Sequence, residues 1–371
     1  MILHPDLDDP GGVAAYFRKL EAGWHTKAEH FIVGRRVSEK MTRRNVWRIA
    51  SDYLRYHKRL KSNDYHVVQI NPSMDPKSVI RDGVFLLLAK RRGAGVVVFF
   101  HGWQKWFEEF LSRRSPGMTI FKRVYGGADA FVVLSRRFEE VLRRWGFEQP
   151  IHHEVMVIED EAIARFDIQA SLLRRLGNRQ WNILFLSRIC KEKGVHEAIE
   201  TVNILKEKYP EVRLQIAGDG PDLKAARTHV KRMNLAQVSF LGYVGGSEKM
   251  RLFEDSHALL NPTWHGEGLP NTVVECMAFG LPVVTRAVGG IQDFFVDSEN
   301  GFSTLSNDPH VFATLLERLY LDRGLYESIS LHNHEQAKST FLASAAATRM
   351  EKIYETVRPT AHLPQEHIRL A

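Results

Sequence analysis

The amino-acid sequence predicts an α/β protein made of two domains, each with a parallel β-sheet covered by helices. Short apolar runs typical of buried strands alternate with longer stretches of helical periodicity, which is the order of βαβ units. The chain has 371 residues, of which 44% are hydrophobic, and this length favours two cores over one. A polar, arginine-containing stretch at 159–180 separates the two series. We therefore expect a first domain over 1–165 and a second over 175–340.

The composition is that of an ordinary globular protein. Charged residues make up 26% of the chain, so nothing suggests disorder. The two cysteines, Cys190 and Cys276, lie far apart, which argues for a reducing compartment and against a disulfide framework. The apolar runs at 84–88 and 96–100 are too short to cross a bilayer, and no signal segment opens the chain. We expect a cytoplasmic protein, with no nucleic-acid partner.

In the first domain, turn and capping residues mark where elements begin. Val13, Phe17 and Leu20 fall at helical spacing after a glycine pair, and Ser135 suits the N-cap of the helix after it. The predicted strands are Met1–His4, His30–Val33, Tyr65–Ile70, Gly95–Phe100, Asp129–Leu134 and Ile151–Ile158. The first predicted helix begins at the glycine pair, and the others cover Thr42–Leu60, Pro76–Lys90 and Arg136–Trp145.

The second domain continues the alternation. Asp308 is expected to cap a helix with Pro309 in its first position, and Pro221 suits the first position of another helix. The predicted strands are Trp181–Leu186, Val212–Ala217, Val238–Leu241, His257–Asn261 and Pro282–Thr285. The predicted helices are Val195–Lys208, Val273–Phe279, Asp308–Leu321 and Glu335–Val357.

The stretch 262–290 combines a glycine turn, a short helix and two carboxylates. The turn at 266–270 follows a strand, and Asn271 or Thr272 is expected to cap the helix after it. Unpaired N–H groups at such a helix N-terminus, beyond the carboxyl end of a parallel strand, form a site for an anion. Glu267 lies on the turn and Glu275 about one helical turn into the helix, so we expect both to face one crevice. The alternative is a buried pair of glutamates that caps a core helix.

The segment EGLPNTVVE, followed by CMAFGLPVV and then VGG, resembles the retaining GT-B glycosyltransferases of sequence family four. The resemblance is densest over 187–290 and thinnest before residue 90. It implies two Rossmann-like domains that face each other across a cleft, and a C-terminal helix, about 344–371 with its tail, that returns to the first domain. It also implies transfer of a glycosyl group, with retention, from a nucleotide-diphosphate sugar to an acceptor hydroxyl.

The resemblance implies that the second domain holds most of the donor. Glu267 would lie against the donor sugar, and Glu275 would accept hydrogen bonds from the ribose hydroxyls. Arg188 and Lys193, in a strand-to-helix loop, would hold the diphosphate, because the developing charge of this leaving group requires fixed cations or a metal. The other donor-binding residues implied are Gly11, Gly12, Gly218, Gly220, Tyr243, Val244, Gly268, Leu269, Pro270, Asn271 and Thr272.

His101 follows the predicted strand at 95–100, and ligands of open α/β sheets bind beyond the carboxyl ends of the strands. The resemblance gives this histidine, followed by Gly102, a contact with the donor sugar. The expected catalytic residues are therefore His101, Glu267, Arg188 and Lys193. Since no Asp-x-Asp motif stands at a strand end, we expect no metal, and no cofactor besides the donor substrate.

Two other functions remain open. A sugar-nucleotide 2-epimerase shares the two-domain plan and the diphosphate cations, but it needs further acid and base groups around the sugar. A non-catalytic nucleotide-sugar sensor has no need of the complete set of carboxylates and cations. The combination of HGEGLPN with His101 and Gly102 favours the transferase.

The positive charge is concentrated in the first domain, which the resemblance makes the acceptor side. Residues 1–150 hold 27 Lys and Arg against 16 Asp and Glu. An apolar and aromatic series follows His101 at mostly helical spacing, and cations lie just beyond it, which is typical of an interfacial helix. The apolar series is Trp103, Trp106, Phe107, Phe110 and Leu111, and the cations are Arg113, Arg114, Lys122 and Arg123. The hypothesis is a lipid-linked saccharide acceptor at the inner, anionic face of the membrane. The alternative is aromatic residues in the core and cations on an ordinary surface, with a soluble saccharide acceptor.

Overall fold

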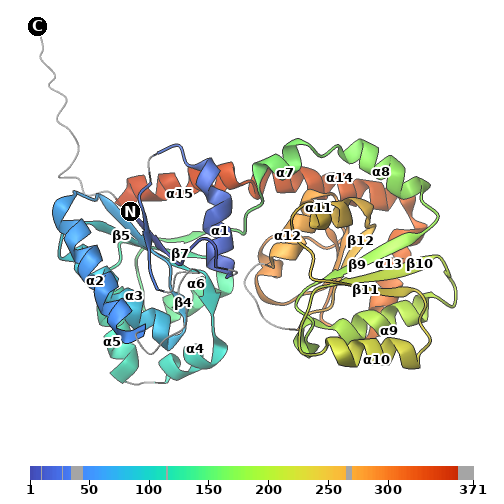
Figure 1. The fold of residues 1–371 in the computed structure, drawn as a ribbon, viewed down its shortest axis with the longest axis horizontal. Helices are drawn as coiled ribbons and strands as arrows, with labels where there is room; N and C mark the ends of the chain where they lie inside the picture. The colour runs from blue at the N-terminus through green and yellow to red at the C-terminus, as the bar shows by residue number, and fades with distance from the viewer. Residues whose placement is uncertain (10, 27, 35–44, 114–115, 265–269, 358–371) are drawn as a thin grey trace, which may run out of the picture. The chain divides into compact units, whose positions relative to one another are not determined.

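The computed structural model describes residues 1–9, 11–26, 28–34, 45–113, 116–264 and 270–357 (Figure 1). Glu267, Gly268, Leu269, Arg114 and the tail from residue 358 therefore lie outside the described residues. The chain divides into two compact units: Met1–Glu154 with the segment from Ala343, and Val155–Leu342. Among the described residues, no helix has the length and apolar content needed to span a membrane.

The first unit contains a six-stranded sheet in the order β2-β1-β3-β5-β7-β8, and all its strand pairs are parallel. The strands are β1 (Ile2–His4), β2 (His30–Ile32), β3 (Val67–Ile70), β5 (Gly95–Phe100), β7 (Ala130–Val133) and β8 (Ile151–His153). The helices are α1 (Gly12–Leu20), α2 (Asn45–Ser62), α3 (Pro76–Lys90), α4 (Lys105–Ser112), α5 (Pro116–Tyr125), α6 (Arg136–Arg144) and α15 (Ala343–Val357). Every residue of β5 is buried, as expected for a strand in the middle of a covered parallel sheet.

Two very short strands, which the sequence does not predict, extend the first unit. β4 (Ser73–Met74) and β6 (Gly102–Trp103) pair in parallel just beyond the ends of β3 and β5. A Cβ at Gly102 would lie 2.8 Å from Ser73 Oγ, so a larger residue after His101 would force the Ser73 side chain to move. The small sheet fixes the segment after β3 against the segment after β5.

The second unit contains a parallel six-stranded sheet in the order β11-β10-β9-β12-β13-β14. The strands are β9 (Trp181–Leu186), β10 (Val212–Ala217), β11 (Val238–Gly242), β12 (Ala258–Asn261), β13 (Val283–Arg286) and β14 (Gly301–Thr304). The helices are α7 (Asp160–Ala164), α8 (Ile168–Gly177), α9 (Val195–Leu205), α10 (Leu223–Arg232), α11 (Gly246–Asp255), α12 (Asn271–Ala278), α13 (Pro309–Leu321) and α14 (Arg323–Thr340). α9 and α13 pack together and share the core with the sheet.

Some of the predicted helix ends are confirmed and others are wrong. Ser135 caps α6 by accepting from Arg137 N at 3.2 Å, and Asp308 caps α13 with Pro309 in its first position. Pro270 is the N-cap of α12, so Asn271 and Thr272 are its first helical residues and not its caps. Similarly, Pro221 precedes Asp222, the N-cap of α10, and lies outside the helix.

The last predicted helix, 335–357, is two helices. α14 ends at Thr340 and α15 begins at Ala343. Between them the chain pairs with a separate segment: Phe341 O accepts from Ile158 N at 2.9 Å, and Leu342 forms a bridge with Ile158. This pairing also explains why β8 ends at His153, since residues 155–158 belong to the second unit.

The stretch at 159–180 is not a linker, because a buried arginine ties it to the second unit. Arg175, on α8, is 2% exposed and donates to the carbonyls of Phe253 and Phe279 at 2.9 Å, and to those of Glu254 and Gly280. These carbonyls end α11 and α12, where a cation is favourable. The unit boundary at 154–155 is therefore earlier than the expected boundary at 165–175.

α15 belongs to the first unit, as the resemblance implies. It packs against α1, β5 and the 3-10 helix at 21–23. Arg349 pairs through Nε and Nη2 with Glu154, a carboxylate that is 2% exposed. A paired arginine is the usual condition for a buried carboxylate.

Candidate active site

The predicted donor-binding residues of the second unit lie after neighbouring strands of one parallel sheet. Arg188 and Lys193 follow β9, Gly218 and Gly220 follow β10, and Tyr243 and Val244 follow β11. Pro270, Asn271 and Thr272 lie between β12 and β13. Because all of these strands are parallel, their carboxyl ends share one edge, which is the binding edge of open α/β sheets.

The backbone of the neighbouring loop holds the segment around Arg188. Ser187 N donates to Ala217 O at 3.2 Å, and Ile189 N donates to Asp219 O at 2.9 Å. Arg188 lies between these two bonds, and its side chain is exposed. These bonds therefore fix the backbone at Arg188, while its side chain is exposed at the carboxyl edge of the second sheet.

Gly218 and Gly220 are required by this packing. Gly218 has a φ of +135°, and a Cβ there would lie 1.9 Å from Ser187 O. A Cβ at Gly220 would lie 2.2 Å from Ile189 O. The two glycines thus permit the close approach of backbone that positions Arg188, and a role beside the donor remains a prediction.

Lys193 ends a 3-10 helix (Lys191–Lys193) and is partly buried. Gly194 follows with a φ of +79°, where a Cβ would lie 2.6 Å from Pro262 O. Glu192 O accepts from Trp264 N at 3.0 Å and from Thr263 Oγ1 at 3.1 Å. The Lys193 loop is therefore held against the chain that leaves β12.

Glu275 has a partner that sequence reasoning missed. Lys249 Nζ, on α11, lies 3.0 Å from Glu275 Oε1, and 14% of the Glu275 side chain is exposed. The two residues are separated by 26 positions on different helices, so no sequence spacing indicates the pair.

Asn271 Oδ1, in the first turn of α12, is buried and has no hydrogen-bond partner among the described residues. Tyr243 is 84% exposed, whereas Val244 is 5% exposed.

In the first unit, His101 lies at the carboxyl end of β5 and contacts a chain of buried amides. Its Nε2 is 3.2 Å from Asn71 Oδ1, which also accepts from Gln69 Nε2 at 2.7 Å. Tyr354, on α15, donates to Gln69 Oε1. Sequence reasoning missed these three residues, because an amide in a short strand, another directly after it and a tyrosine near the C-terminus give no motif.

Aromatic rings surround the His101 imidazole. Phe99 stacks on it at 3.8 Å, and Tyr16 and Phe17 of α1 meet it at 5.1 Å and 5.7 Å. Burial among these rings lowers the pKa of His101 to about 3. The ring is therefore neutral at physiological pH, and it does not supply positive charge to a leaving phosphate.

Gly11 and Gly12, which open α1, are not required by the fold. Gly11 has a φ of −73°, and a Cβ there would find its nearest contact at 4.0 Å. A Cβ at Gly12 would find no atom within 4 Å among the described residues. The open space at this N-terminus agrees with the predicted approach of donor phosphates to the backbone.

Comparison with known proteins assigns both halves of the chain. The family model described as Glycosyltransferase Family 4 matches residues 11–153, and the model described as Glycosyl transferases group 1 matches residues 174–336.

The capsular polysaccharide biosynthesis glycosyltransferase CapM of Staphylococcus aureus is 28% identical over 185 residues, 49% of this chain and 48% of that protein. The putative colanic acid biosynthesis glycosyltransferase WcaL of Escherichia coli K12 is 25% identical over 243 residues, 62% of this chain and 57% of that protein. The chain spans about half the length of the curated relatives it matches.

Solved structures share the fold over nearly the whole chain. Sucrose-phosphate synthase from Thermosynechococcus elongatus has a TM-score of 0.68 at 16% identity, covering 96% of this chain and 98% of that one. HepE of Anabaena, solved with UDP and glucose, has a TM-score of 0.68 at 14% identity with the same coverage. The expected fold, two Rossmann-like halves of the GT-B type, is confirmed. Each half of the chain thus matches a glycosyltransferase family model, family four in the first half and group one in the second, and the whole chain shares the GT-B fold.

Proposed function

We propose that the chain transfers a glycosyl group, with retention, from a nucleotide-diphosphate sugar to a hydroxyl of a saccharide or lipid-linked saccharide. The observation that supports this most strongly is the carboxyl edge of the second sheet. There Arg188 and Lys193 follow β9, and the N-terminus of α12 follows the neighbouring strand β12. Cations beside a helix N-terminus form a site for a diphosphate. Two proteins of this fold were solved with such ligands, HepE with UDP and glucose and the pneumococcal GtfA with UDP and GlcNAc.

In this proposal, catalysis depends on placement and electrostatics. Arg188 offers a planar fork of donors and Lys193 a compact charge, and both stabilise the departing diphosphate without a metal. The departing phosphate takes the proton of the acceptor hydroxyl. Glu267 and His101 position the reacting sugar, and Glu275 binds the ribose, so none of the three is a covalent nucleophile.

A thermal-shift screen with UDP, GDP, ADP, their sugars and the corresponding nucleosides tests donor binding. A ligand at a hundred times its dissociation constant stabilises the protein by about 2.7 kcal/mol. We expect one nucleotide series to raise the melting temperature, with the diphosphates effective and the nucleosides not. No shift with any nucleotide would contradict the proposal. Incubation with the stabilising sugar nucleotide then distinguishes the two enzymes: a transferase releases nucleoside diphosphate, whereas an epimerase returns an altered sugar still on its nucleotide.

The structure divides the aromatic series proposed to contact a membrane. Phe107 and Leu111 are in the core, and Trp103 stacks on Phe138 at 4.3 Å. Trp106 is 58% exposed and Phe110 is 48% exposed. Trp103, Phe107 and Leu111 therefore belong to the core or pack against it, as the alternative expects. Trp106 and Phe110 instead form an exposed apolar face on α4.

Exposed cations accompany this apolar face, and they support the proposal of peripheral binding to an anionic membrane with a lipid-linked acceptor. They are Lys105, Arg113, Lys122 and Arg123. Vesicle co-sedimentation tests it: binding should increase with anionic lipid, decrease with salt and be lost in the variant Trp106→Ala/Phe110→Ala. Leu173→Ala, at a residue of the second unit that is 72% exposed, is the matched control and should bind normally. No binding of the wild type at low salt would contradict the membrane proposal and leave a soluble acceptor.

A further inference from the structure

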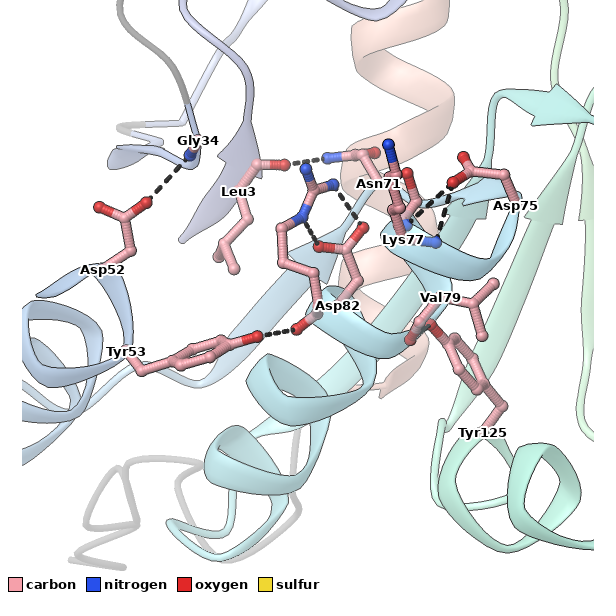
Figure 2. Close-up of polar contacts among 12 residues, drawn as sticks. Leu3, Gly34, Asp52, Tyr53, Asn71, Asp75, Lys77, Val79, Asp82 and Tyr125 are labelled. Atoms are coloured by element: carbon pink, nitrogen blue, oxygen red, sulfur yellow. Dashed lines mark hydrogen bonds and ion pairs between the residues drawn. The ribbon is translucent and has the colours of Figure 1, made fainter. Parts of the chain in front are cut away.

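The orientation of the Asn71 side chain determines which nitrogen of His101 carries a proton. Asn71 Nδ2 donates to Leu3 O, in β1, at 2.5 Å, a contact that Figure 2 shows as a dashed line between the two labelled residues. A backbone carbonyl only accepts, so the amide nitrogen must face Leu3 and Oδ1 must face the other way. Oδ1 lies 3.2 Å from His101 Nε2. Because an amide oxygen cannot donate, Nε2 carries the hydrogen and Nδ1 is left as an acceptor.

A second contact enforces the same orientation from the opposite side. Gln69 Nε2 donates to Asn71 Oδ1 at 2.7 Å, and Tyr354 donates to Gln69 Oε1. Burial raises the pKa of Tyr354 well above its usual range, so this hydroxyl keeps its proton. Gln69 and Asn71 are 1% and 7% exposed, so water competes little for these bonds.

The side chains described around the imidazole do not stabilise a positive charge on the ring. On α1, burial raises the pKa of Tyr16 well above its usual range, so the phenol is neutral. His4, which stacks on Phe17, has a pKa lowered by burial. The charged side chains that act on Tyr16 are Glu154 and Arg349, and they are paired with each other. Neutral neighbours and a neutral amide favour the neutral imidazole.

We propose that Asn71 is a positioning residue that holds His101 as the Nε2-protonated imidazole, so that Nδ1 accepts a hydrogen bond from a sugar hydroxyl. This inference rests on the proposed function, because the glycosyl donor or the saccharide acceptor supplies the hydroxyl. Phosphate and carboxylate oxygens carry no hydrogen at neutral pH, so Nδ1 discriminates against them. An amide at position 71 is needed, since an aspartate there would favour the imidazolium and convert Nδ1 into a donor.

Nuclear magnetic resonance of the full chain labelled with ¹⁵N-histidine tests the tautomer without any need for activity. Comparison with His101→Gln identifies the signals of His101. We expect one neutral ring, protonated on Nε2, unchanged from about pH 5 to about pH 8. A proton on Nδ1, or titration of the ring near the ordinary histidine value, would overturn the assignment.

Two variants separate the positioning role from a structural one. In Asn71→Asp the ring should be doubly protonated at neutral pH, and donor turnover should fall roughly tenfold per pH unit below the new pKa and recover above it. Tyr354→Phe is the matched control: it breaks the outer contact but keeps the Leu3 bond, so the tautomer should persist. An Asn71→Asp protein that keeps the neutral ring and the wild-type pH profile would contradict the proposal. If that variant does not fold, the wild-type spectrum still decides.

Ligand probes identify the hydroxyl. A change at Nδ1 with UDP-glucose or GDP-mannose, but not with UDP or GDP, assigns it to the donor sugar. A change only after addition of a saccharide that serves as acceptor assigns it to the acceptor. An unchanged Nδ1 in a protein that turns these substrates over would overturn the role. A protein that binds no probe contradicts the proposed function and with it the sugar hydroxyl, while the unliganded spectrum decides the tautomer separately.

Discussion

Lys249 and Glu275 form an ion pair across two helices of the second unit, with 3.0 Å between Nζ and Oε1. Both side chains are mostly buried, at 25% and 14% exposure. In such surroundings the loss of one partner leaves the other charge poorly compensated. If Glu275 binds the donor ribose, Lys249 holds the carboxylate in place for it.

The ion pair predicts a kinetic signature. Glu275→Gln should raise the KM for the donor, and Lys249→Met should raise it by a smaller factor, with kcat little changed in both. The double variant should be no worse than Glu275→Gln, because Lys249 acts through Glu275. Steady-state kinetics of the four proteins check this, and independent, additive effects would contradict the link.

The cations of the β9 loop should act on the diphosphate. Arg188→Ala and Lys193→Ala should each weaken binding of the nucleoside diphosphate by about 1.5–3 kcal/mol, the usual contribution of a hydrogen bond to a charged group. Isothermal titration with the diphosphate and with its nucleoside measures the difference. Equal losses for both ligands would show that the two residues are structural.

Two glycines should respond in opposite ways to substitution by alanine. Gly12→Ala adds a methyl group to open space in a helix, so thermal stability should be unchanged or higher while donor affinity falls. Gly218→Ala places the methyl group against Ser187 O and should destabilise the second unit by more than about 1 kcal/mol. Melting temperatures and donor titrations of both variants check the contrast. Normal donor binding by Gly12→Ala would contradict the predicted phosphate contact.

His257 should make the second unit sensitive to acid. Its Nδ1 accepts from Asn182 N at 3.0 Å, its Nε2 bonds to Arg175 O at 2.9 Å, and burial lowers its pKa to about 4. Between the ordinary value of 6.5 and this value, the unfolded chain binds more protons than the folded one. The stabilisation, about 3 kcal/mol, is therefore complete above pH 6.5 and is lost as the pH falls towards 4.

Urea denaturation at several pH values measures this loss. His257→Gln keeps a donor and an acceptor but does not titrate, so its stability should depend less on pH across the window. An equally steep decline in the variant would show that other groups cause the sensitivity. His101, with its pKa of about 3, should add a similar slope in the first unit.

Local patterns predicted the elements that local forces decide. The predicted limits of β5, β9, β10 and α3 are confirmed, because apolar runs or caps mark their ends. The break between α14 and α15 has no glycine or proline and depends on pairing with Ile158, which lies far away in sequence. Sequence alone could not reveal that contact.

The candidate site shows the same division. The strand-end positions of His101, Arg188 and Lys193 follow from the alternation of strands and helices. Their partners do not, since Asn71, Lys249 and Arg175 act through contacts between elements that the fold alone brings together. Arginine is rarely buried, so the sequence does not indicate that Arg175 lies in the core. The four carbonyls that accept from it explain why it does.

Proton NMR of the anomeric region during incubation with the stabilising sugar nucleotide reports glycosyl transfer and its stereochemistry together. We expect the anomeric signal of the donor to decay while nucleoside diphosphate appears, and the first product to carry the sugar in the anomeric configuration of the donor. Arg188→Ala and Lys193→Ala should slow both changes together. A first product of inverted configuration would contradict retention, and a changed sugar still joined to its nucleotide would contradict glycosyl transfer itself.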